Sequence, residues 1–573
     1  MKVSDCIGSF LYAQGVRYVF VVIGGMITHI VDSIHRQGKI RIIDTHHEQA
    51  AAFAVDAAGR ITGVPVVAMA TSGPGATNLL TGIGSCYFDS APAVFLTGQV
   101  NRDEQKGSRP IRQLGFQETD IVSLAKPITK AAWLVSSPEE VPDLLAKAFT
   151  LAISGRPGPV LLDIPMDVQR ADVVVKTPVQ ISAPVDYPLE QGAVDGLLDG
   201  LSAARRPLVL AGGGIRAARA VALFRTFVEQ IKVPVVNSLM AVDILPYAHP
   251  LRVGMIGTYG NRWANMAIGL SDFLLVMGSR LDIRQTGSDT KAFKGNRVIY
   301  QADFEATEIN NRVRGCRAIV AHLHPFLTAA IQASTLHVLP QWSEWLAELA
   351  ELRRKWPETA ELQGVRGINP NELMHQLAVA SQSAAAFIAD VGQNQMWAAQ
   401  SLELGLNQRF VTSGGMGAMG FALPASVGVS LAYPNRPVVM ISGDGGFQLN
   451  IQELQTVVSN NLPIKIVVLN NQCYGMVRQF QQSYFEERYP STYWGYTAPD
   501  FARVAKAYGI SALTVEKTSE VEEGLRCLWH NPEEPFLMQV MLDPLTNVYP
   551  KIAFGRPITE MEPFAKPVDL EGT

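Results

Sequence analysis

Short apolar runs, rich in β-branched residues, alternate along the chain with longer stretches in which apolar residues recur at helical spacing. Such runs, bounded by Gly, Pro and polar residues, are typical of buried strands, and their alternation with helices predicts parallel sheets with crossover helices. The alanine-rich stretch 48–60 (EQAAAFAVDAAGR) is predicted to be a helix. The predicted strands of the first third lie in residues 16–23, 39–44, 65–71, 91–98 and 158–169.

Two further α/β units follow the first. The second opens with a strand that runs into glycines and then a helix (206–220), and further strands are predicted in 271–282 and 296–304. A polar stretch (341–367) is predicted to be a helix and connector. The third unit has predicted strands in 384–392, 436–445, 463–471 and 535–542.

We therefore predict an α/β protein with three doubly wound parallel-sheet domains, because 573 residues are too many for one hydrophobic core. The first and third units are interpreted as distant structural repeats, although no sequence period supports this. A linker is predicted over 175–188. The predicted domains span residues 1–170, 189–335 and 368–550, and a C-terminal tail spans 551–573.

Composition and charge exclude several classes of function. The net charge is -4 and the basic residues are dispersed, which argues against binding to nucleic acid. The five cysteines are unclustered, which favours reduced thiols and a cytoplasmic location over a disulfide framework. The uncharged run 410–435 contains glycines and Pro424, so we expect a buried segment of a soluble enzyme rather than a membrane span.

One motif in the third unit carries specific chemistry. A predicted strand ends in Gly443, Asp444, Gly445 and Gly446, and the next predicted strand ends in Asn470-Asn471, with a predicted helix (447–458) between them. Open α/β sheets bind ligands at the carboxyl ends of their strands. A carboxylate, an amide carbonyl and a backbone carbonyl suit Mg²⁺, and the glycines allow close approach of a diphosphate. The alternative is a glycine turn beside an unrelated asparagine pair.

This arrangement resembles the diphosphate-binding signature of thiamine-diphosphate enzymes. The resemblance implies that Asp444, Asn471 and the backbone oxygen of Cys473 bind Mg²⁺. It also implies a glutamate that hydrogen-bonds the pyrimidine N1′ of the cofactor and favours its imino tautomer, and Glu48 in THHEQAAAF matches it. Alternatively, Glu48 is a helix N-terminal carboxylate that offsets the helix dipole. By this resemblance, domain 1–170 binds the pyrimidine and domain 368–550 binds the diphosphate.

Over nearly the whole chain, the nearest resemblance is to the acetohydroxyacid (acetolactate) synthases. It rests on TSGPGATNL (71–79), FQET (116–119), DVGQNQMWAAQ (390–400), TSGGMGAMGFALP (412–424) and LNNQCYGMVRQFQQ (469–482). It implies that the enzyme decarboxylates pyruvate and transfers the two-carbon unit to a carbonyl acceptor. It also implies a homodimer or homotetramer, because residues of two domains must meet across a subunit boundary.

The same resemblance assigns individual residues. Met419 would hold the cofactor in a bent shape, or it is a plain core methionine. Gly25, Glu48 and Gln117 would face the thiazolium from the opposing subunit, and with Met419 they form the implied catalytic set. The implied cofactor-binding residues are Pro74, Asn78, Gly392, Gln393, Asn394, Gly417, Gly443, Asp444, Gly445, Gly446, Asn471, Tyr474, Gly475 and Met476.

Members of this family carry FAD in the middle domain, where it takes no part in turnover. The resemblance implies the same non-redox FAD here, in a central Rossmann-like domain. The alternative is an intact fold that has lost the flavin or binds ADP. The residues at matching positions are Gly212, Gly213, Gly214, Gly278, Arg280, Arg284 and Asp303.

The sequence departs from the family where the acceptor should enter, beside Phe116. Phe480 replaces a tryptophan that favours 2-oxobutyrate, which should weaken that preference by about 1–3 kcal/mol at most. Thr258 and Tyr259 stand in GMIGTYG where the family reads GMxGMHG. The usual PGGA becomes IGGM, followed by His29, which either contacts the acceptor or is an ordinary helix-face histidine.

These departures leave several activities open. The acceptor is either pyruvate, which gives acetolactate, or a keto-deoxysugar nucleotide, which gives a branched sugar. An oxidase related to pyruvate oxidase, with FAD as electron acceptor, is the alternative class, along with a simple 2-oxo acid decarboxylase. A catalytically silent assembly subunit would not be expected to keep Glu48, Asp444 and Asn471 together.

Overall fold

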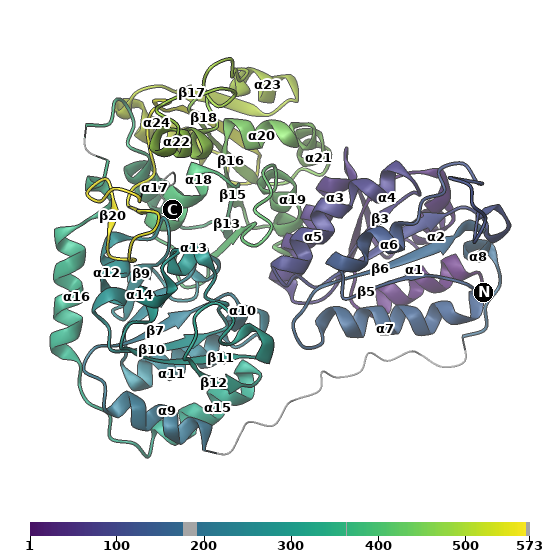
Figure 1. The fold of residues 1–573 in the computed structure, drawn as a ribbon. Helices are drawn as coiled ribbons and strands as arrows, with labels where there is room; N and C mark the ends of the chain where they lie inside the picture. Colours follow the sequence, from purple (N-terminus) through teal and green to yellow (C-terminus); the bar gives the residue numbers. More distant parts are fainter. Residues whose placement is uncertain (176–191, 363, 569–573) are drawn as a thin grey trace.

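The computed structural model describes residues 1–175, 192–362 and 364–568. Within these residues the chain forms three α/β lobes, each around a six-stranded parallel sheet, which confirms the predicted fold class (Figure 1). The first lobe is purple and blue, the middle lobe teal and the third lobe green. The predicted linker, apart from Val175, lies outside the described residues.

The first sheet contains β1 (Tyr18–Val22), β2 (Arg41–Asp44), β3 (Val66–Ala70), β4 (Ala93–Gln99), β5 (Ala131–Leu134) and β6 (Pro159–Pro165). The helices of this domain are α1 (Val3–Ala13), α2 (Thr28–Gln37), α3 (Glu48–Thr62), α4 (Pro74–Asn78), α5 (Leu80–Phe88), α6 (Ile121–Ala125), α7 (Val141–Ile153) and α8 (Met166–Arg170).

The middle sheet contains β7 (Pro207–Ala211), β8 (Val235–Asn237), β9 (Arg252–Met255), β10 (Phe273–Met277), β11 (Val298–Asp303) and β12 (Arg317–Val320). Its helices are α9 (Ala193–Ser202), α10 (Gly214–Ala217), α11 (Val221–Ile231), α12 (Arg262–Leu270), α13 (Ile283–Thr286), α14 (Thr290–Lys294) and α15 (Leu323–Ser334), and α16 (Ser343–Lys355) leads to the third domain.

The third sheet contains β13 (Ala386–Ala389), β14 (Arg409–Thr412), β15 (Val438–Gly443), β16 (Ile464–Asn470), β17 (Ser511–Val515) and β18 (Phe536–Met541). Its helices are α17 (Pro370–Ala380), α18 (Gln393–Ser401), α19 (Ala422–Ala432), α20 (Asp444–Leu449), α21 (Leu454–Ser459), α22 (Gly475–Tyr484), α23 (Phe501–Ala507) and α24 (Val521–Leu528). The C-terminal segment pairs β19 (Lys551–Ile552) with β20 (Met561–Glu562).

Strand order relates the three sheets to one another. The first sheet runs β2-β1-β3-β4-β6-β5 and the third runs β14-β13-β15-β16-β18-β17, which is the same order of strands within each domain. This shared topology supports the interpretation of the two domains as structural repeats. The middle sheet runs β12-β11-β10-β7-β8-β9, which is the Rossmann order.

Each sheet has a place near its centre where the strand order reverses. Crossover connections on the two sides of such a point leave in opposite directions, so a crevice opens outside the carboxyl ends of the two central strands. These strands are β1 and β3 in the first sheet, β7 and β10 in the middle sheet, and β13 and β15 in the third. The topology therefore gives each domain one preferred ligand position.

Helix α3 joins the first and third domains. It begins after His47, whose ring nitrogen accepts a hydrogen bond from the Gln49 amide, and it ends at Gly63 in the left-handed conformation. Its alanines permit close packing along α19, where Phe53 meets Phe421 edge to face with ring centroids 5.4 Å apart. One buried hydrophobic cluster consequently extends through both domains.

The structure contains strands that were not predicted from the sequence, and one predicted helix is broken. In the three parallel sheets, the strands that were not predicted are β5, β8, β9, β12, β14 and β17. The predicted helix 447–458 is broken into α20 and α21, because Asn450 leaves the helical conformation and its side-chain amide donates to the carbonyl of Gly420 at 2.8 Å. Asn450 thereby ties the two helices to the glycine-rich segment that precedes α19.

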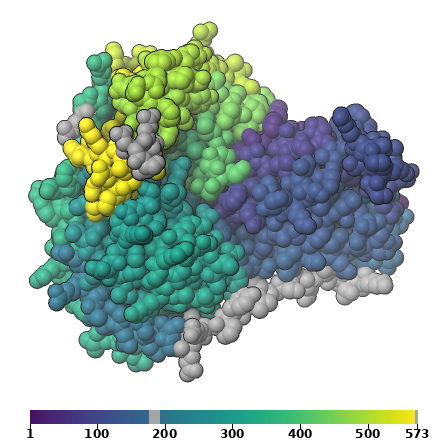
Figure 2. All heavy atoms as spheres, viewed as in Figure 1, coloured from purple at the N-terminus to yellow at the C-terminus, as the bar shows by residue number. Residues whose placement is uncertain are grey.

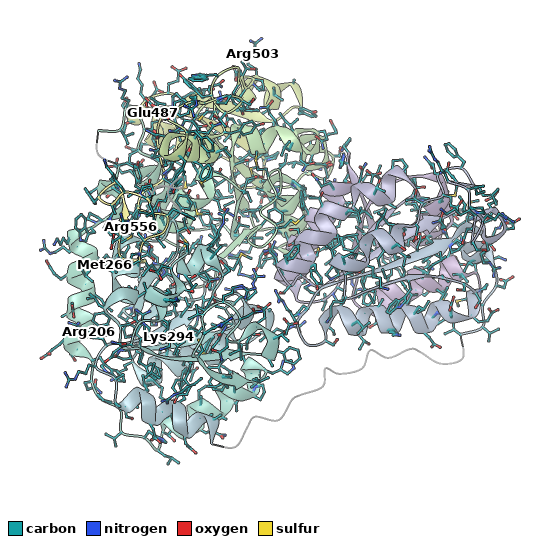
Figure 3. All side chains as sticks on the ribbon, viewed as in Figure 1. Arg206, Met266, Lys294, Glu487, Arg503 and Arg556 are labelled. Atoms are coloured by element: carbon teal, nitrogen blue, oxygen red, sulfur yellow. The ribbon has the colours of Figure 1, made fainter. Side chains whose placement is uncertain are left out.

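The visible surface is continuous over the three lobes (Figure 2). Charged side chains such as Arg206, Glu487 and Arg503 lie at the periphery (Figure 3). Among the residues that the structure describes, every helix is too short or too polar to span a lipid bilayer.

The contact between α3 and α19 depends on a glycine. A Cβ atom at Gly428 would collide with the backbone carbonyl of Ala54. We expect Gly428→Ala to destabilise the protein by about 1–3 kcal/mol, because neither backbone can move without disturbing the shared core. At Gly405 the nearest atom to an added Cβ is the flexible Gln408 side chain at 3.4 Å, so Gly405→Ala is the matched control. Thermal unfolding that begins at the same temperature in both variants would contradict this packing.

Candidate active site

The third-domain half of the site lies at the switch point between β13 and β15. Asp444 follows β15 and is 2% exposed. Its Oδ2 atom makes no hydrogen bond of regular geometry with the described residues, although the Tyr496 hydroxyl lies near the carboxylate. Burial raises the pKa of Asp444 to about 7, because no cationic side chain offsets the loss of hydration. A buried carboxylate oxygen of this kind can accept a hydrogen bond from a ligand or bind a cation.

Asn471, at the end of β16, lies beside Asp444 in this half. Its side-chain amide donates to Gln393 Oε1 at 3.1 Å, and its Oδ1 accepts from the Cys473 amide at 3.3 Å. The structure therefore brings together the three residues that the resemblance assigned to the metal. The Cys473 thiol itself points away and contacts the carbonyl of Pro544 at 3.3 Å.

Glycines line this crevice, and their lack of side chains leaves space above the strand ends. An added Cβ at Gly445 would strike the Tyr474 ring, and one at Gly475 would strike the Gln393 side chain. The side chain of Asn394 is anchored to the carbonyl of Asp390 at 2.7 Å. Larger residues at the glycine positions would fill the space above the strand ends. Gly392 and Gly443 lie beside the Asn394 side chain, and Gly446 lies beside Asp390. Met476 on α22 packs against the hydrophobic core of the third domain.

Met419 lies half-buried in the segment between β14 and α19, and two carboxylates hold that segment. The buried Asp390 carboxylate accepts from the Gly420 amide at 3.0 Å and from the Ala422 amide at 2.8 Å. Asp89 of the first domain accepts from the Gly415 amide at 2.7 Å. The neighbouring Gly417 has a φ of +65°, and no atom lies within 4 Å of its Cβ direction.

The first-domain half lies at the switch point between β1 and β3. Glu48 begins α3, is 9% exposed, and its Oε2 atom accepts from the Asn78 side-chain amide at 2.9 Å. A Cβ at Gly75 would lie 3.2 Å from Glu48 Oε1, so the loop of Pro74 runs directly beside the carboxylate. Glu48, Pro74 and Asn78 are thus neighbours.

Gly25 and Gln117 border the same loop from opposite sides. Gly25 is exposed, and the turn that contains it is fixed by Gln169, whose side-chain amide donates to the Met26 carbonyl at 2.7 Å. Gln117 packs against Gly73, where an added Cβ would lie 3.0 Å from Gln117 Cβ. The first-domain residues that the resemblance assigned to the cofactor therefore lie within residues 71–78 or close to them.

Both halves present large exposed apolar side chains. Phe116 is 79% exposed in the first domain, and Val477 and Phe480 on α22 are 52% and 46% exposed in the third. Phe480 stacks at 4.7 Å, between ring centroids, on Tyr484. His29 lies half-buried on α2. The four residues predicted for the acceptor side thus come from different domains, since Thr258 belongs to the middle domain.

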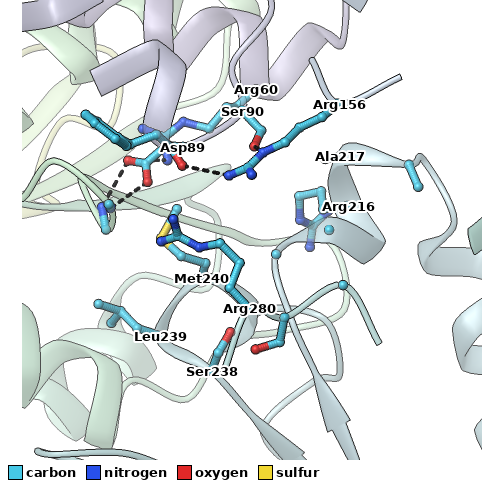
Figure 4. A pocket seen from close by; sticks show the side chains of 18 of the residues that line it. Arg60, Asp89, Ser90, Arg156, Arg216, Ala217, Ser238, Leu239, Met240 and Arg280 are labelled. Atoms are coloured by element: carbon cyan, nitrogen blue, oxygen red, sulfur yellow. Dashed lines mark hydrogen bonds and ion pairs between the residues drawn. The ribbon is translucent and has the colours of Figure 1, made fainter. Parts of the chain in front are cut away.

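A cavity of about 880 Å³ lies between the three domains at the switch point of the middle sheet (Figure 4). Arg216 and Arg280 of the middle domain stand on one side, and Asp89 and Arg156 of the first domain stand on the other. Burial raises the pKa of Asp303, at the end of β11, to about 6. Of the residues predicted for FAD, those that line the cavity are Gly213, Gly214, Gly278, Arg280, Arg284 and Asp303.

Two predicted residues occupy unexpected places around this cavity. Gly212 lies behind the lining, where an added Cβ would strike the Gly278 carbonyl. Thr258 lines the cavity itself, and its amide donates to the Arg284 carbonyl at 2.7 Å. The predicted acceptor residue therefore shares a wall with residues predicted for the flavin.

No role was predicted from the sequence for Asp390, Asn450 or Ser72. Asp390 follows β13 at a switch point, Ser72 contacts Gln117, and Asn450 holds Gly420, the residue after Met419. A carboxylate directly after β13 was a usable signal for Asp390, because strand ends at the switch point face the ligand. The contacts of Asn450 and Ser72 join segments distant in sequence, so no local sequence pattern predicts them.

Comparison with known proteins identifies the family to which this chain is related. The model of the thiamine pyrophosphate enzyme N-terminal TPP binding domain matches residues 1–124, the central domain model matches 194–330, and the C-terminal TPP binding domain model matches 390–540.

Full-length relatives agree with these matches. The acetolactate synthase large subunit of Lactococcus lactis is 35% identical over 561 residues, covering 97% of this chain and 95% of that protein. The acetolactate synthase isozyme 2 large subunit of Escherichia coli is 38% identical over 552 residues, covering 96% and 97%. A probable acetolactate synthase large subunit of Methanocaldococcus jannaschii is 34% identical over 590 residues, covering 100% and 96%. The chain belongs to the acetolactate synthase family of thiamine pyrophosphate enzymes.

As a thiamine-diphosphate-dependent carboligase of this family, the chain has residues that fit the diphosphate and its metal. The buried Oδ2 of Asp444, the Asn471 side-chain carbonyl and the Cys473 backbone are oxygen donors of the kind that Mg²⁺ prefers. In the described ranges no cluster of three or more His, Cys, Asp or Glu could hold a metal ion. A site with a single carboxylate leaves coordination positions for phosphate oxygens.

The cavity of the middle domain likewise fits a dinucleotide. Gly213 and Gly214 follow β7 and Gly278 follows β10, so backbone can approach a pyrophosphate closely. Arginines from two domains supply the positive charge. Asp303 stands at the end of β11, where a carboxylate can accept from ligand hydroxyl groups.

We expect Asp444→Asn to weaken thiamine diphosphate binding by about 10-fold or more at fixed Mg²⁺, because the substitution removes the only carboxylate of the predicted metal set. Fluorescence titration with thiamine diphosphate measures this change. Asp500→Asn is the matched control, since Asp500 caps α23 in the same domain and asparagine caps equally well. Equal affinity of the two variants would refute the assignment of Asp444.

Proposed function

We propose that this chain decarboxylates pyruvate and joins the remaining two carbons to a carbonyl acceptor, with a second pyruvate as acceptor and acetolactate as product. The observation that carries this proposal is that one chain contains both halves of the site. In the first domain the Asn78 side-chain amide donates to Glu48, and in the third domain the buried Asp444 Oδ2 makes no regular hydrogen bond with the described residues. Each half stands at the switch point of its sheet.

The proposed cofactors are thiamine diphosphate and Mg²⁺. When bound, the thiazolium of thiamine diphosphate supplies the electron sink for the pair left by departing CO₂. Asp444, Asn471 and Cys473 would hold the metal, and Glu48 would keep a hydrogen bond on the pyrimidine N1′. The Asn78 contact orients Glu48 for this task, and its low exposure limits competition by water.

The overall reaction breaks the bond between the carboxylate and the keto carbon of one pyruvate and releases CO₂. A new carbon–carbon bond forms to the keto carbon of the second pyruvate, whose oxygen takes up a proton. Gly25 leaves room for the donor, and Gln117 would orient it. Met419 would limit the space between the two halves and thus exclude water.

We propose a homodimer, or a pair of such dimers, with active sites between subunits. The two halves in one chain each face outward with exposed apolar groups, notably Phe116 in the first domain and Val477 in the third. A second copy that pairs its first domain with this third domain would bury those groups and complete both sites.

We also propose that FAD occupies the middle-domain cavity as a structural group. The size of the cavity, the glycines at its strand ends and the arginines around it support this assignment. FAD in this position would contact all three domains and would therefore stabilise their arrangement.

A keto-sugar nucleotide is the second candidate acceptor, because the chain departs from the family at residues predicted for the acceptor side. Phe480 offers a smaller face than tryptophan, and Thr258 replaces a larger methionine in GMIGTYG. Together with His29, these changes alter the residues predicted for the acceptor side rather than those proposed for the cofactor.

Replacement of Glu48 tests the proposed function. Glu48→Gln can still accept from Asn78, yet it lacks the negative charge that stabilises the required tautomer. We expect kcat for pyruvate consumption to fall by about 100-fold or more, while thiamine diphosphate affinity changes little. Glu139→Gln, at an exposed position of the same domain, should turn over normally. Near-normal turnover of Glu48→Gln would end the proposal.

Replacement of Phe480 tests the acceptor side. In competition between pyruvate and 2-oxobutyrate, Phe480→Trp should raise the ratio of acetohydroxybutyrate to acetolactate by about 10-fold, since the larger ring adds contacts to the extra methyl group. Phe485→Trp is the control, because Phe485 belongs to the same aromatic cluster and is equally exposed. An unchanged ratio in Phe480→Trp would place the acceptor elsewhere.

A further inference from the structure

A chain of buried polar groups runs through the first domain toward the candidate site, and no step proposed above uses it. It starts at Asp163 in β6, which is 1% exposed. Asp163 Oδ1 accepts from the Thr97 hydroxyl at 2.7 Å, and its Oδ2 accepts from Gln99 Nε2 at 2.9 Å. Burial raises the pKa of Asp163 to about 7. A charged carboxylate at this buried position costs folding free energy.

The carboxyl of Asp163 fixes which way the Gln99 amide points. Asp163 presents acceptor oxygens, so Gln99 turns its NH₂ group toward them and its Oε1 toward Ser72. The same NH₂ group donates to the Thr119 carbonyl at 2.8 Å, and Oε1 accepts from the Val100 amide at 3.0 Å. Gln99 therefore has every donor and acceptor engaged, which leaves it no second orientation.

Ser72 links this network to Gln117. Its hydroxyl oxygen lies 2.7 Å from the Gln117 backbone carbonyl and 3.1 Å from Gln99 Oε1. Because a hydroxyl has one proton, Ser72 donates to the nearer acceptor, the Gln117 carbonyl, and its oxygen only contacts Gln99 Oε1. With the Gln99 bond to Thr119, the network holds the backbone on both sides of Glu118.

Gln117 needs such support because its backbone is strained. Its φ is +65°, in the left-handed region that costs a non-glycine residue about 1–2 kcal/mol. Gly73, with a φ of +67°, makes room for it, since an added Cβ there would press on the Gln117 side chain. A strained residue persists only where its surroundings over-determine it, and such residues gather at functional sites.

We propose that Asp163, Gln99 and Ser72 are positioning residues that set the Gln117 side chain toward the donor substrate. This inference rests on the proposed function, in which Gln117 faces the reacting carbons. The three residues touch neither substrate nor cofactor. Their effect on turnover passes entirely through the conformation of Gln117.

A double-mutant cycle separates this role from simple support of the fold. Ser72→Ala should lower kcat for pyruvate about 3- to 10-fold, equivalent to one lost hydrogen bond, with little change in half-saturating thiamine diphosphate. In the Gln117→Ala background, Ser72→Ala should lower kcat no further, because the side chain that it positions is gone. Ser33→Ala is the matched control: Ser33 is a buried serine of the same domain, bonded to Ser4 at 2.9 Å and remote from the site.

The conservative exchange at Asp163 adds a rescue test. Asp163→Asn can accept from Gln99 through its carbonyl and donate to Thr97, whose hydroxyl can reverse, so kcat should stay within about 2-fold of the parent. Asp163→Leu, whose side chain has the same branching and the same number of heavy atoms, removes the carboxylate acceptor of Gln99 and should lower kcat as Ser72→Ala does. Equal losses in the two Asp163 variants would overturn the proposed orientation of Gln99.

Hydrogen exchange supplies a readout that needs no cofactor. In the protein without thiamine diphosphate, Ser72→Ala should speed exchange in residues 115–121, whereas Ser33→Ala should not. Equal kcat losses from Ser72→Ala in both backgrounds, or unchanged exchange in 115–121, would overturn the inference. If Gln117→Ala alone turned over pyruvate normally, the role of Gln117 in the proposed function would fail, although faster exchange would still show that the network holds the segment.

Discussion

Reversal of strand order in a parallel sheet is the constraint on which the rest of this structure depends. Parallel strands leave all their carboxyl ends on one edge, and the reversal opens a crevice there. The chain uses this device three times, between β1 and β3, between β7 and β10, and between β13 and β15. The Pro74 loop, the cavity glycines and Asp444 lie at these points. The order of the buried hydrophobic strands thus determines where the polar residues of the candidate sites lie.

The segments that carry the polar groups at these crevices are held in place by other buried polar side chains. Asp390 fixes the backbone beside Met419, Asn450 ties the same segment to α20, and Asp89 reaches it from the first domain. Helix α3 carries Glu48 at its start and packs along α19 over its length. A shift of the first domain against the third would therefore move both a proposed catalytic carboxylate and the segment that bounds the cofactor.

Much of this was predictable from sequence, for a physical reason. Continuous apolar runs and glycine-ended strands are local signals, so the three parallel sheets could be predicted from pattern, and the structure confirms them. The metal set around Asp444 came from resemblance and stays a prediction. The break at Asn450 and the Ser72 contact to Gln117 depend on residues far apart in sequence, which no local period encodes. The place of Thr258 in the cavity wall was unforeseen, because a loop residue's position is set by the strands on either side.

The central claim is that this chain condenses pyruvate with loss of CO₂, and carbon-13 NMR of labelled pyruvate tests it most directly. The purified protein is incubated with Mg²⁺ and thiamine diphosphate and no other acceptor. The account predicts that labelled acetolactate accumulates with release of labelled CO₂, and that both stop when thiamine diphosphate or Mg²⁺ is withheld. Pyruvate that persists unchanged in the complete mixture would contradict it.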